Sequence, residues 1–230
     1  MNKGIQKVFS EVSNTYEVVN HVLTFGLDTL WRRKAAKVAA MGDGTRWMDM
    51  CSGTGQTAIY LRRLAEKNTM VIAADFCLPM LRKAIVKPEA HPIAFTLADA
   101  DALPFRDSTF DLITISLATR NIHVNRESLL RCLGEFYRIL RPGGRFVNLE
   151  TSQPPVRLVR KLFHLYVRLM VRHLGYIISG SRAGYAYLSH TIPRFYSADE
   201  FSDILRQTGF LKVHFHYMVF GVVAIHKAVK

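Results

Sequence analysis

Cysteine is scarce in this sequence. Only three of its 230 residues are cysteines, Cys51, Cys77 and Cys132, an odd number without the spacing of metal ligands. The longest uncharged apolar run, 217–225, is much shorter than the roughly 20 residues of a membrane-spanning helix. A signal peptide, internal repeats and a Pro/Ser-rich linker are absent as well. These absences exclude a segment that crosses a membrane, and they predict one domain in a reducing cytoplasm.

Acidic residues are also few: 18 Asp and Glu stand against 31 Lys and Arg, which leaves a formal net charge of +13. A protein this basic usually meets phosphate, in nucleic acid or on an anionic membrane surface, although plain solubility is the alternative. Within 157–172 the basic residues share one helical face, and leucines and aromatic residues fill the rest. The basic residues are Arg157, Lys161, Arg168 and Arg172, and the leucines are Leu158, Leu162, Leu165 and Leu169. Such a helix suits a lipid surface, and its alternative is an ordinary lid helix with a solvated face.

What the sequence does contain is a nucleotide-binding pattern. An apolar strand over 45–50 runs into the turn Ser52-Gly53-Thr54-Gly55-Gln56, and a second strand over 70–74 ends in Asp75. Gly53 and Gly55 let the backbone approach a ligand, the next helix points free N–H groups at it, and Asp75 can hold a ribose diol. The same turn fits the G-x-G-x-x-A fingerprint of dehydrogenases, so the segments downstream must decide.

Strands and helices alternate through the middle of the chain, which indicates a parallel sheet. Strands are predicted at 45–50, 70–74, 92–97, 110–116, 144–150, 211–217 and 219–226. Helices are predicted at 5–23, 28–40, 56–66, 78–86, 126–140, 155–178 and 198–207. The short link between the last two strands indicates an antiparallel hairpin. Five parallel strands followed by such a hairpin resemble the sheet of the S-adenosylmethionine-dependent methyltransferases.

The order of these pieces closely resembles the quinone C-methyltransferases of menaquinone and ubiquinone biosynthesis, over nearly the whole chain. Outside the glycine-rich turn, the likeness is carried by the segments Val8-Phe9, Tyr16-Glu17, 20–32, 113–116, Arg120-Asn121-Ile122, 185–188 and 221–226. The resemblance implies an α/β fold of the Rossmann-like class I methyltransferase type, with a seven-stranded, mostly parallel sheet, an antiparallel C-terminal hairpin and helices on both faces. Its single domain comprises a helical annex (1–43), a cofactor-binding core (44–150), a helical insert facing substrate and membrane (151–197), and a C-terminal helix and hairpin (198–230).

The resemblance also implies the reaction, which is C-methylation of a prenylated quinol, demethylmenaquinol or a related benzoquinol, with S-adenosylmethionine as cofactor. Carried over by position, the cofactor contacts are Thr54, Asp75, Asp99, Ala100 and Ser116. The carboxylate of Asp99, after the third strand, can accept a hydrogen bond from the adenine amine. Asp49, at the end of the first strand, can order the turn and face the amino-acid part of the cofactor.

Several positions depart from the family pattern. Ser52 and Gln56 stand where the family reads Gly and Asp, Asp99 replaces a usual Asn, and Val124 takes the place of an acid. The turn therefore lacks a carboxylate, and substrate or reaction details are left open by these departures.

The candidate catalytic residues follow the fourth strand. We expect Arg120 and Asn121 to hold the ring oxygen, with Arg120 stabilising a developing phenolate, since an arginine is too basic to remove a proton. His123 is a candidate proton acceptor, or a structural hydrogen-bonding group. Tyr16 is a candidate for closing the pocket, or for aromatic packing. No metal is expected.

Because a prenylated substrate lies in the bilayer, we expect the basic helix 157–172 to make peripheral contact with an anionic membrane at its inner, cytoplasmic face. Nucleic acid is not expected, because Gln153-Pro154-Pro155-Val156 follows the fifth strand, whereas the base-gripping motif of nucleic-acid methyltransferases follows the fourth. The sequence leaves open whether the chain forms a homodimer. The alternatives are a methyltransferase of another lipophilic small molecule, an NAD-dependent oxidoreductase, and a non-catalytic component of a membrane complex.

Overall fold

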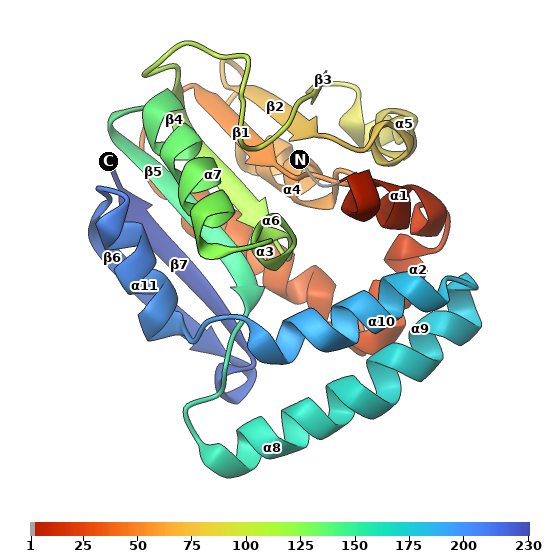
Figure 1. Ribbon diagram of the computed structural model, residues 1–230. Coiled ribbons are helices and arrows are strands. Elements are labelled where there is room, and N and C mark those ends of the chain that lie inside the picture. The colour runs from red at the N-terminus through yellow and green to blue at the C-terminus, as the bar shows by residue number, and fades with distance from the viewer. Residues whose placement is uncertain (1–2) are drawn as a thin grey trace.

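The centre of the protein is a seven-stranded sheet in the order β3-β2-β1-β4-β5-β7-β6, seen in the computed structural model, which describes residues 3–230 (Figure 1). Its strands are β1 (Arg46–Met50), β2 (Met70–Asp75), β3 (Ala94–Leu97), β4 (Phe110–Ser116), β5 (Leu140–Thr151), β6 (Leu211–Met218) and β7 (Val223–Val229). Strands β1 to β5 are parallel, and β7 runs antiparallel between β5 and β6. This arrangement confirms the predicted fold class.

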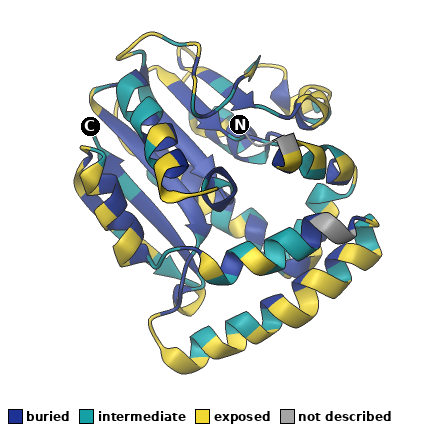
Figure 2. Cartoon of the chain, in the orientation of Figure 1, coloured by how far each residue is buried: buried dark blue, intermediate teal, exposed yellow. Residues whose placement is uncertain are grey.

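Helices cover both faces of the sheet because its strands alternate apolar side chains between the two faces. Along β4, Ile113 and Ile115 pack in one core with α7 and α11, whereas Leu112 packs in the other core with α3 and α4. These helices are α3 (Leu27–Ala40), α4 (Gln56–Leu64), α7 (Arg126–Ile139) and α11 (Ala198–Gln207), and α5 (Leu78–Ile85) lies between β2 and β3 in the chain. The buried strands of Figure 2 lie between these two layers.

The chain changes direction across the sheet between β1 and β4. Strands β2 and β3 lie on one side of β1, and the later strands lie on the other side. Ligands of open α/β sheets bind at the carboxyl ends of the strands at such a switch point. The residues that follow β1, β2 and β4 are therefore the ones to examine for a site.

The N-terminal annex differs from the single helix predicted at 5–23, which was wrong. Two helices are present, α1 (Lys3–Val12) and α2 (Tyr16–Leu23). Hydroxyl groups end α1: Ser13 Oγ donates to the Ser10 carbonyl at 2.9 Å, and Thr15 Oγ1 donates to the Val12 carbonyl at 3.4 Å. Side chains that bond local carbonyls in this way compete with the helix. The break lets α1 lie across the carboxyl end of the sheet.

The insert after β5 contains the helix predicted at 155–178 and one helix that was not predicted. Helix runs without interruption through α8 (Arg157–Tyr166), a π-helical turn η2 (Val167–Val171) and α9 (Arg172–Ser179). Gly180 then adopts a left-handed conformation with φ of 72°, and α10 (Arg182–Thr191), which was not predicted, returns along α9 (Figure 1). Glycine is the usual residue at such a helix end.

Two strand boundaries were predicted wrongly. Strand β5 begins at Leu140, and the stretch 141–144 is an irregular part of it, where the pairing with β4 shifts in register. The last two strands are joined by a 3-10 turn, η4 (Val219–Gly221), so that β7 begins at Val223. Gly221 has φ of 91°, and an added Cβ would lie 2.6 Å from Pro155, so that this turn requires glycine.

The packing of α9 on α10 gives a first prediction. A Cβ added at Gly175 would lie 2.1 Å from the buried ring of Tyr185, so Gly175→Ala is expected to destabilise the fold by about 1–3 kcal/mol through overpacking. Gly134, inside α7, has nothing within 4 Å of an added Cβ. Gly134→Ala should therefore stabilise the fold by about 0.5–1 kcal/mol. Urea denaturation measures both, and equal shifts would contradict the close packing.

Candidate active site

The turn after β1 brings its backbone toward the switch point. Cys51, Gly53 and Gly55 have φ values of 52°, 55° and 78°, all in the left-handed region. The Ser52 amide donates to the Ala74 carbonyl at 3.0 Å, which ties the turn to β2. A Cβ added at Gly53 would meet nothing within 4 Å. The turn therefore leaves open space beside its backbone, which is where a ligand approaches.

Asp75 holds two segments in place at the end of β2. Its Oδ2 accepts from the Gly53 amide and its Oδ1 from the Cys77 amide, each at 2.8 Å. The carboxyl is 5% exposed, and burial raises its pKa to about 6. Each carboxylate oxygen has room for one more hydrogen bond, so that the pair can receive a diol.

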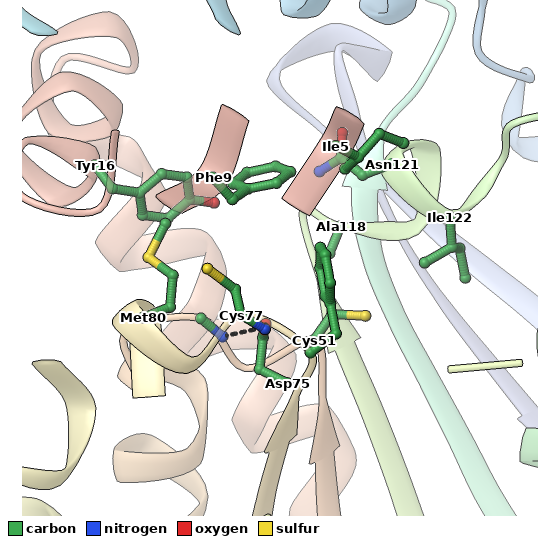
Figure 3. A pocket seen from close by; sticks show the side chains of 12 residues that line it. Ile5, Phe9, Tyr16, Cys51, Asp75, Cys77, Met80, Ala118, Asn121 and Ile122 are labelled. Carbon is green, nitrogen blue, oxygen red and sulfur yellow. Dashed lines mark hydrogen bonds between the residues drawn. The ribbon is translucent and has the colours of Figure 1, made fainter. Parts of the chain in front are cut away.

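A narrow cavity of about 40 Å³ opens above Asp75. Figure 3 shows the Phe9 and Tyr16 rings, from α1 and α2, on one side of it and Asp75 on the other. A second cavity of about 210 Å³ adjoins Asp99 and Ala100. Ile5, Asn121 and Ile122 line both cavities, so we interpret them as two compartments of one elongated site beneath α1.

A short helix, α6 (Thr119–Ile122), presents two neighbouring side chains to different spaces. Asn121 lines both compartments, and its buried Oδ1 has no hydrogen-bond partner among the described residues. Arg120 instead lines a groove of about 500 Å³ whose walls are mostly apolar. Tyr16 lines both this groove and the compartment above Asp75. The candidate site therefore joins a polar cavity to an apolar groove at α6 and Tyr16.

Arg120 is held by a residue that the sequence analysis did not single out. Its Nη1 lies 2.5 Å from Glu150 Oε1, and its backbone amide donates to Glu150 Oε2 at 3.1 Å. Glu150, 1% exposed at the end of β5, also accepts from the Thr151 amide at 2.8 Å and hydroxyl at 3.0 Å. The sequence contained a signal for this role, because Glu150 ends the strand predicted at 144–150, at the same edge of the sheet as the other candidate residues.

Four predicted cofactor residues lie beneath the two compartments and do not line them: Asp49, Thr54, Gly55 and Ser116. Asp49 accepts from the Thr114 hydroxyl at 2.7 Å, and burial raises the pKa of its carboxyl to about 7. Arg32, which the sequence analysis did not select, donates to the Ser116 carbonyl at 3.5 Å. The Thr54 carbonyl accepts from Lys87 Nζ at 2.8 Å. These contacts hold the turn and the carboxyl ends of β1 and β4 in place.

Asp99 and Ala100 line the larger compartment, as predicted contacts of a bound nucleotide should. Burial and then the neighbouring Asp101 raise the pKa of Asp99. Ala100 is almost fully buried, so that only its backbone and a small part of its side chain reach the cavity. Their part in binding a cofactor stays a prediction.

A family model described as the ubiE/COQ5 methyltransferase family matches residues 1–230. The chain belongs to this family. The demethylmenaquinone methyltransferase of Thermus thermophilus is 37% identical to it over 221 residues, which cover 95% of this chain and 98% of that protein. The ubiquinone/menaquinone biosynthesis C-methyltransferase UbiE of Desulfotalea psychrophila is 33% identical over 227 residues, 99% of this chain and 90% of that protein. The resemblance predicted from the sequence is thus confirmed.

A solved structure supports the fold of this methyltransferase independently. A SAM-dependent methyltransferase from Thermotoga maritima superposes with a TM-score of 0.70, covering 98% of this chain and 99% of its own, at 18% sequence identity. At that identity the likeness concerns the fold alone. The matched family favours a methyltransferase over the dehydrogenase that the glycine-rich turn also permits.

The donor and acceptor groups of the site fit S-adenosylmethionine, the methyl donor that the family implies. The cofactor carries a ribose diol, an adenine amine and an ammonium group, all hydrogen-bond donors. The site offers acceptors: the Asp75 carboxylate, the unpartnered Asn121 Oδ1 and the Asp99 carboxylate beside the larger compartment. Polar groups buried without a partner are costly, so Asn121 Oδ1 indicates a donor from a ligand.

His123 lies apart from these cavities in this methyltransferase. Its Nε2 is 3.1 Å from the Tyr196 hydroxyl, and its ring contacts Phe195 and Tyr196. Burial lowers the pKa of His123, which keeps the ring neutral at pH 7. His123 lines neither compartment nor the groove. Its role as proton acceptor stays a prediction.

Burial keeps two of the three thiols protonated, and within residues 3–230 no cluster of metal-binding side chains is present. Burial raises the pKa of Cys132 to about 12 and that of Cys51 well above its usual value, so both thiols are protonated at pH 7. In this described part of the chain, no three His, Cys, Asp or Glu side chains lie close enough together to hold a metal ion.

Proposed function

We propose that the protein transfers the methyl group of S-adenosylmethionine to a ring carbon of a prenylated quinol. The observation that carries this proposal is the junction at α6, where Asn121 faces the polar compartments and Arg120 faces the apolar groove. Family membership and the names of the two relatives, a demethylmenaquinone methyltransferase and a ubiquinone/menaquinone C-methyltransferase, support the same reaction.

In the proposed complex, the Asp75 carboxylate accepts hydrogen bonds from the ribose hydroxyls. Asp99 and Ala100 contact the adenine end of the cofactor in the larger compartment. Gly53 allows close approach of the backbone, and Asn121 Oδ1 accepts from the cofactor. Thr54 and Gly55 belong to the turn itself, and Asp49 and Ser116 lie near or at the ends of the strands next to it. When bound, S-adenosylmethionine supplies an electrophilic methyl group on its sulfonium centre.

Arg120 is proposed to hold the quinol oxygen and to stabilise the phenolate. Its side-chain hydrogen bonds to described residues all run from Nη1, which leaves the other guanidinium N–H groups as donors for a ligand of the groove that Arg120 lines. Orientation of the ring can contribute roughly 7–11 kcal/mol, compared with about 3–5 kcal/mol from acid–base help. Positioning by Arg120 and Tyr16 should therefore dominate. The quinol hydroxyl gives its proton to water or to the predicted acceptor His123, and the methylated ring carbon then loses its own proton to water as the aromatic ring is restored.

The apolar groove is proposed to hold the prenyl chain. Trp31, Leu117 and Val223 line its walls, and Phe25 and Phe220, which are 80% and 82% exposed, stand at its rim. An apolar chain in this groove leaves water, which favours binding by about 25 cal/mol per Å² of buried apolar surface. A lipid tail is the ligand that such walls suit.

Filling the groove should separate tail binding from chemistry. Val159 lines the groove from α8, so Val159→Trp is expected to raise KM for a long-tailed quinol by about tenfold or more, through loss of tail contacts of about 1.4 kcal/mol. The same variant should leave kcat and KM for an unprenylated quinol within about twofold, because the ring site is unchanged. Steady-state kinetics on both substrates test this, and an equal effect on both would argue against the groove as the tail site.

Peripheral contact with an anionic membrane is part of the proposal. The leucines of α8 and η2 are exposed, with Leu158 at 66% and Leu162 at 58%. The same helix carries the basic residues Arg157, Lys161, Arg168 and Arg172. Within the described residues no helix is both long and apolar enough to cross a membrane. Exposed leucines beside cations suit a helix that lies in the membrane interface.

The experiment that tests the function uses S-adenosylmethionine with a labelled methyl group. Demethylmenaquinol and a matching benzoquinol are the two acceptors, and the product's labelled ring carbon is located by mass spectrometry. Label on a ring carbon of either quinol supports the proposal. Titration with S-adenosylmethionine and with NADH accompanies the assay, and binding of NADH alone would reject it.

A further inference from the structure

The helical insert carries basic residues and no acidic ones. Between Glu150 and Asp199 the sequence contains no acidic residue. Seven basic residues occur there: Arg157, Arg160, Lys161, Arg168, Arg172, Arg182 and Arg194. A charge distribution of this kind produces a positive local potential that attracts anions.

Several of these cations converge on one cleft. A cavity of about 650 Å³ lies between α8–η2–α9 and the facing α10 with the turn η3 (Ile192–Arg194). Lys161, Arg168, Arg172 and Arg194 line it together with Ser189 and Leu165. In the described part of the chain, no carboxylate forms an ion pair with Lys161, Arg168 or Arg172. Cations that face one cleft without carboxylates are suited to a phosphate group.

Apolar residues adjoin the same cleft. Leu165 lines it at 42% exposure, and Leu169 is 47% exposed on the next turn of the helix. Figure 2 shows exposed residues along the outward side of this helix. Inorganic phosphate or a nucleotide would use only the cations, whereas a phospholipid offers a phosphate to the cations and acyl chains to the leucines. The paired chemistry therefore favours a lipid.

A lipid bound in this cleft would lie next to the apolar groove, because α8 borders both. The helix separates the basic cleft, lined by Lys161 and Leu165, from the apolar groove, lined by Val159 and Leu162. At the rim of that groove, Phe25 and Phe220 are exposed and have φ values of 52° and 53°. A left-handed backbone is unfavourable for residues other than glycine, so the conformations of Phe25 and Phe220 cost free energy.

We propose that the cleft between α8–α9 and α10 binds the phosphate headgroup of an anionic phospholipid. Binding there seats α8 on the membrane, with the mouth of the groove at the lipid surface between Phe25 and Phe220. The use of the groove rests on the proposed function, because only a lipophilic substrate needs a mouth at the membrane. The headgroup site itself does not depend on which quinol is methylated.

The test measures flotation of the full chain with vesicles of phosphatidylcholine alone and of phosphatidylcholine mixed with phosphatidylglycerol. Wild-type protein should bind the mixed vesicles. Arg168→Gln/Arg172→Gln should weaken this binding by about 30-fold, at about 1 kcal/mol for each basic residue near an anionic surface. The matched control is Lys67→Gln/Arg106→Gln, which removes two exposed charges at the amino ends of β2 and β4, the opposite edge of the sheet.

The outcomes separate the sources of phosphate and the two proposals. Control binding within about threefold of wild type supports a specific cleft, whereas equal losses in both variants would reduce it to net charge. Binding of inorganic phosphate without binding to the mixed vesicles, or binding to a DNA duplex without binding to vesicles, would overturn the lipid assignment. Methylation of an unprenylated quinol should be unchanged in Arg168→Gln/Arg172→Gln, so failure of the function and failure of the lipid site give different results.

Discussion

Glu150→Ala is expected to destabilise the protein by about 3–5 kcal/mol and to abolish methyl transfer, because it leaves the Arg120 guanidinium buried without a counter-charge. Arg120 is 9% exposed, so its guanidinium charge lies largely out of water. The ion pair with Glu150, at 2.5 Å, offsets the cost of burying this charge. The Glu150 carboxylate also accepts hydrogen bonds from the amides of Arg120 and Thr151 and so orients them. Urea denaturation measures the first effect, and the labelled-methyl assay measures the second.

A double variant distinguishes stability from catalysis at this pair. Arg120→Met/Glu150→Gln removes both charges, so that much of the lost stability should return, since a neutral pair of similar volume replaces a buried ion pair at little cost. Activity should stay absent, because Arg120 is proposed to contact the quinol oxygen. Recovery of activity in the double variant would exclude Arg120 from the reaction. Full stability of Glu150→Ala would exclude the buried ion pair.

Asp75→Ala is expected to weaken S-adenosylmethionine binding by about 150-fold to 20,000-fold. Two hydrogen bonds to a charged acceptor contribute about 1.5–3 kcal/mol each, and both are lost. The amides of Gly53 and Cys77 lose their acceptor too, which loosens the turn. Isothermal titration measures the affinity. Asp43→Ala, which removes an exposed carboxylate before the start of β1, is the matched control and should bind as wild type does.

The pH dependence of binding adds a second readout at Asp75. Burial raises its pKa to about 6, and only the ionised carboxylate accepts from both ribose hydroxyls. Affinity should therefore be constant above pH 6 and fall by about tenfold for each pH unit below it, because a proton must leave before the ligand binds. Asp75→Asn, which cannot ionise, should lose this component of the pH dependence. An unchanged profile in Asp75→Asn would place the titrating group elsewhere.

Much of the cofactor end could be predicted because its pattern is local. The turn at Gly53 and Gly55 needs left-handed backbone, and an acid at the end of the second strand is close to that turn in any parallel sheet. The strands themselves follow from runs of apolar residues, and β1 to β4 lie within two residues of their predicted bounds. Local geometry and short connections leave few other arrangements.

The substrate end could not be predicted in the same way. The partnership of Arg120 with Glu150 joins residues 30 positions apart, and it depends on how α6 turns after β4. Helix α10 was missed because glycines at 180 and 184 obscure its pattern, although Ser181 caps it and Tyr185 packs on Gly175. The groove needs walls from five regions of the chain, including α2, α8 and η4.

By itself, the sequence determined the class of fold, the nucleotide-binding turn with Asp75, the family and the basic, leucine-rich character of 157–172, since each depends on residues close together in the chain. Only the tertiary structure decided that Asn121 and Arg120 face two different spaces, that Asp49 and Ser116 lie beneath the cavities, and that His123 packs away from them. Those properties depend on which side chains distant segments bury together, and packing of that kind is not encoded in any short pattern.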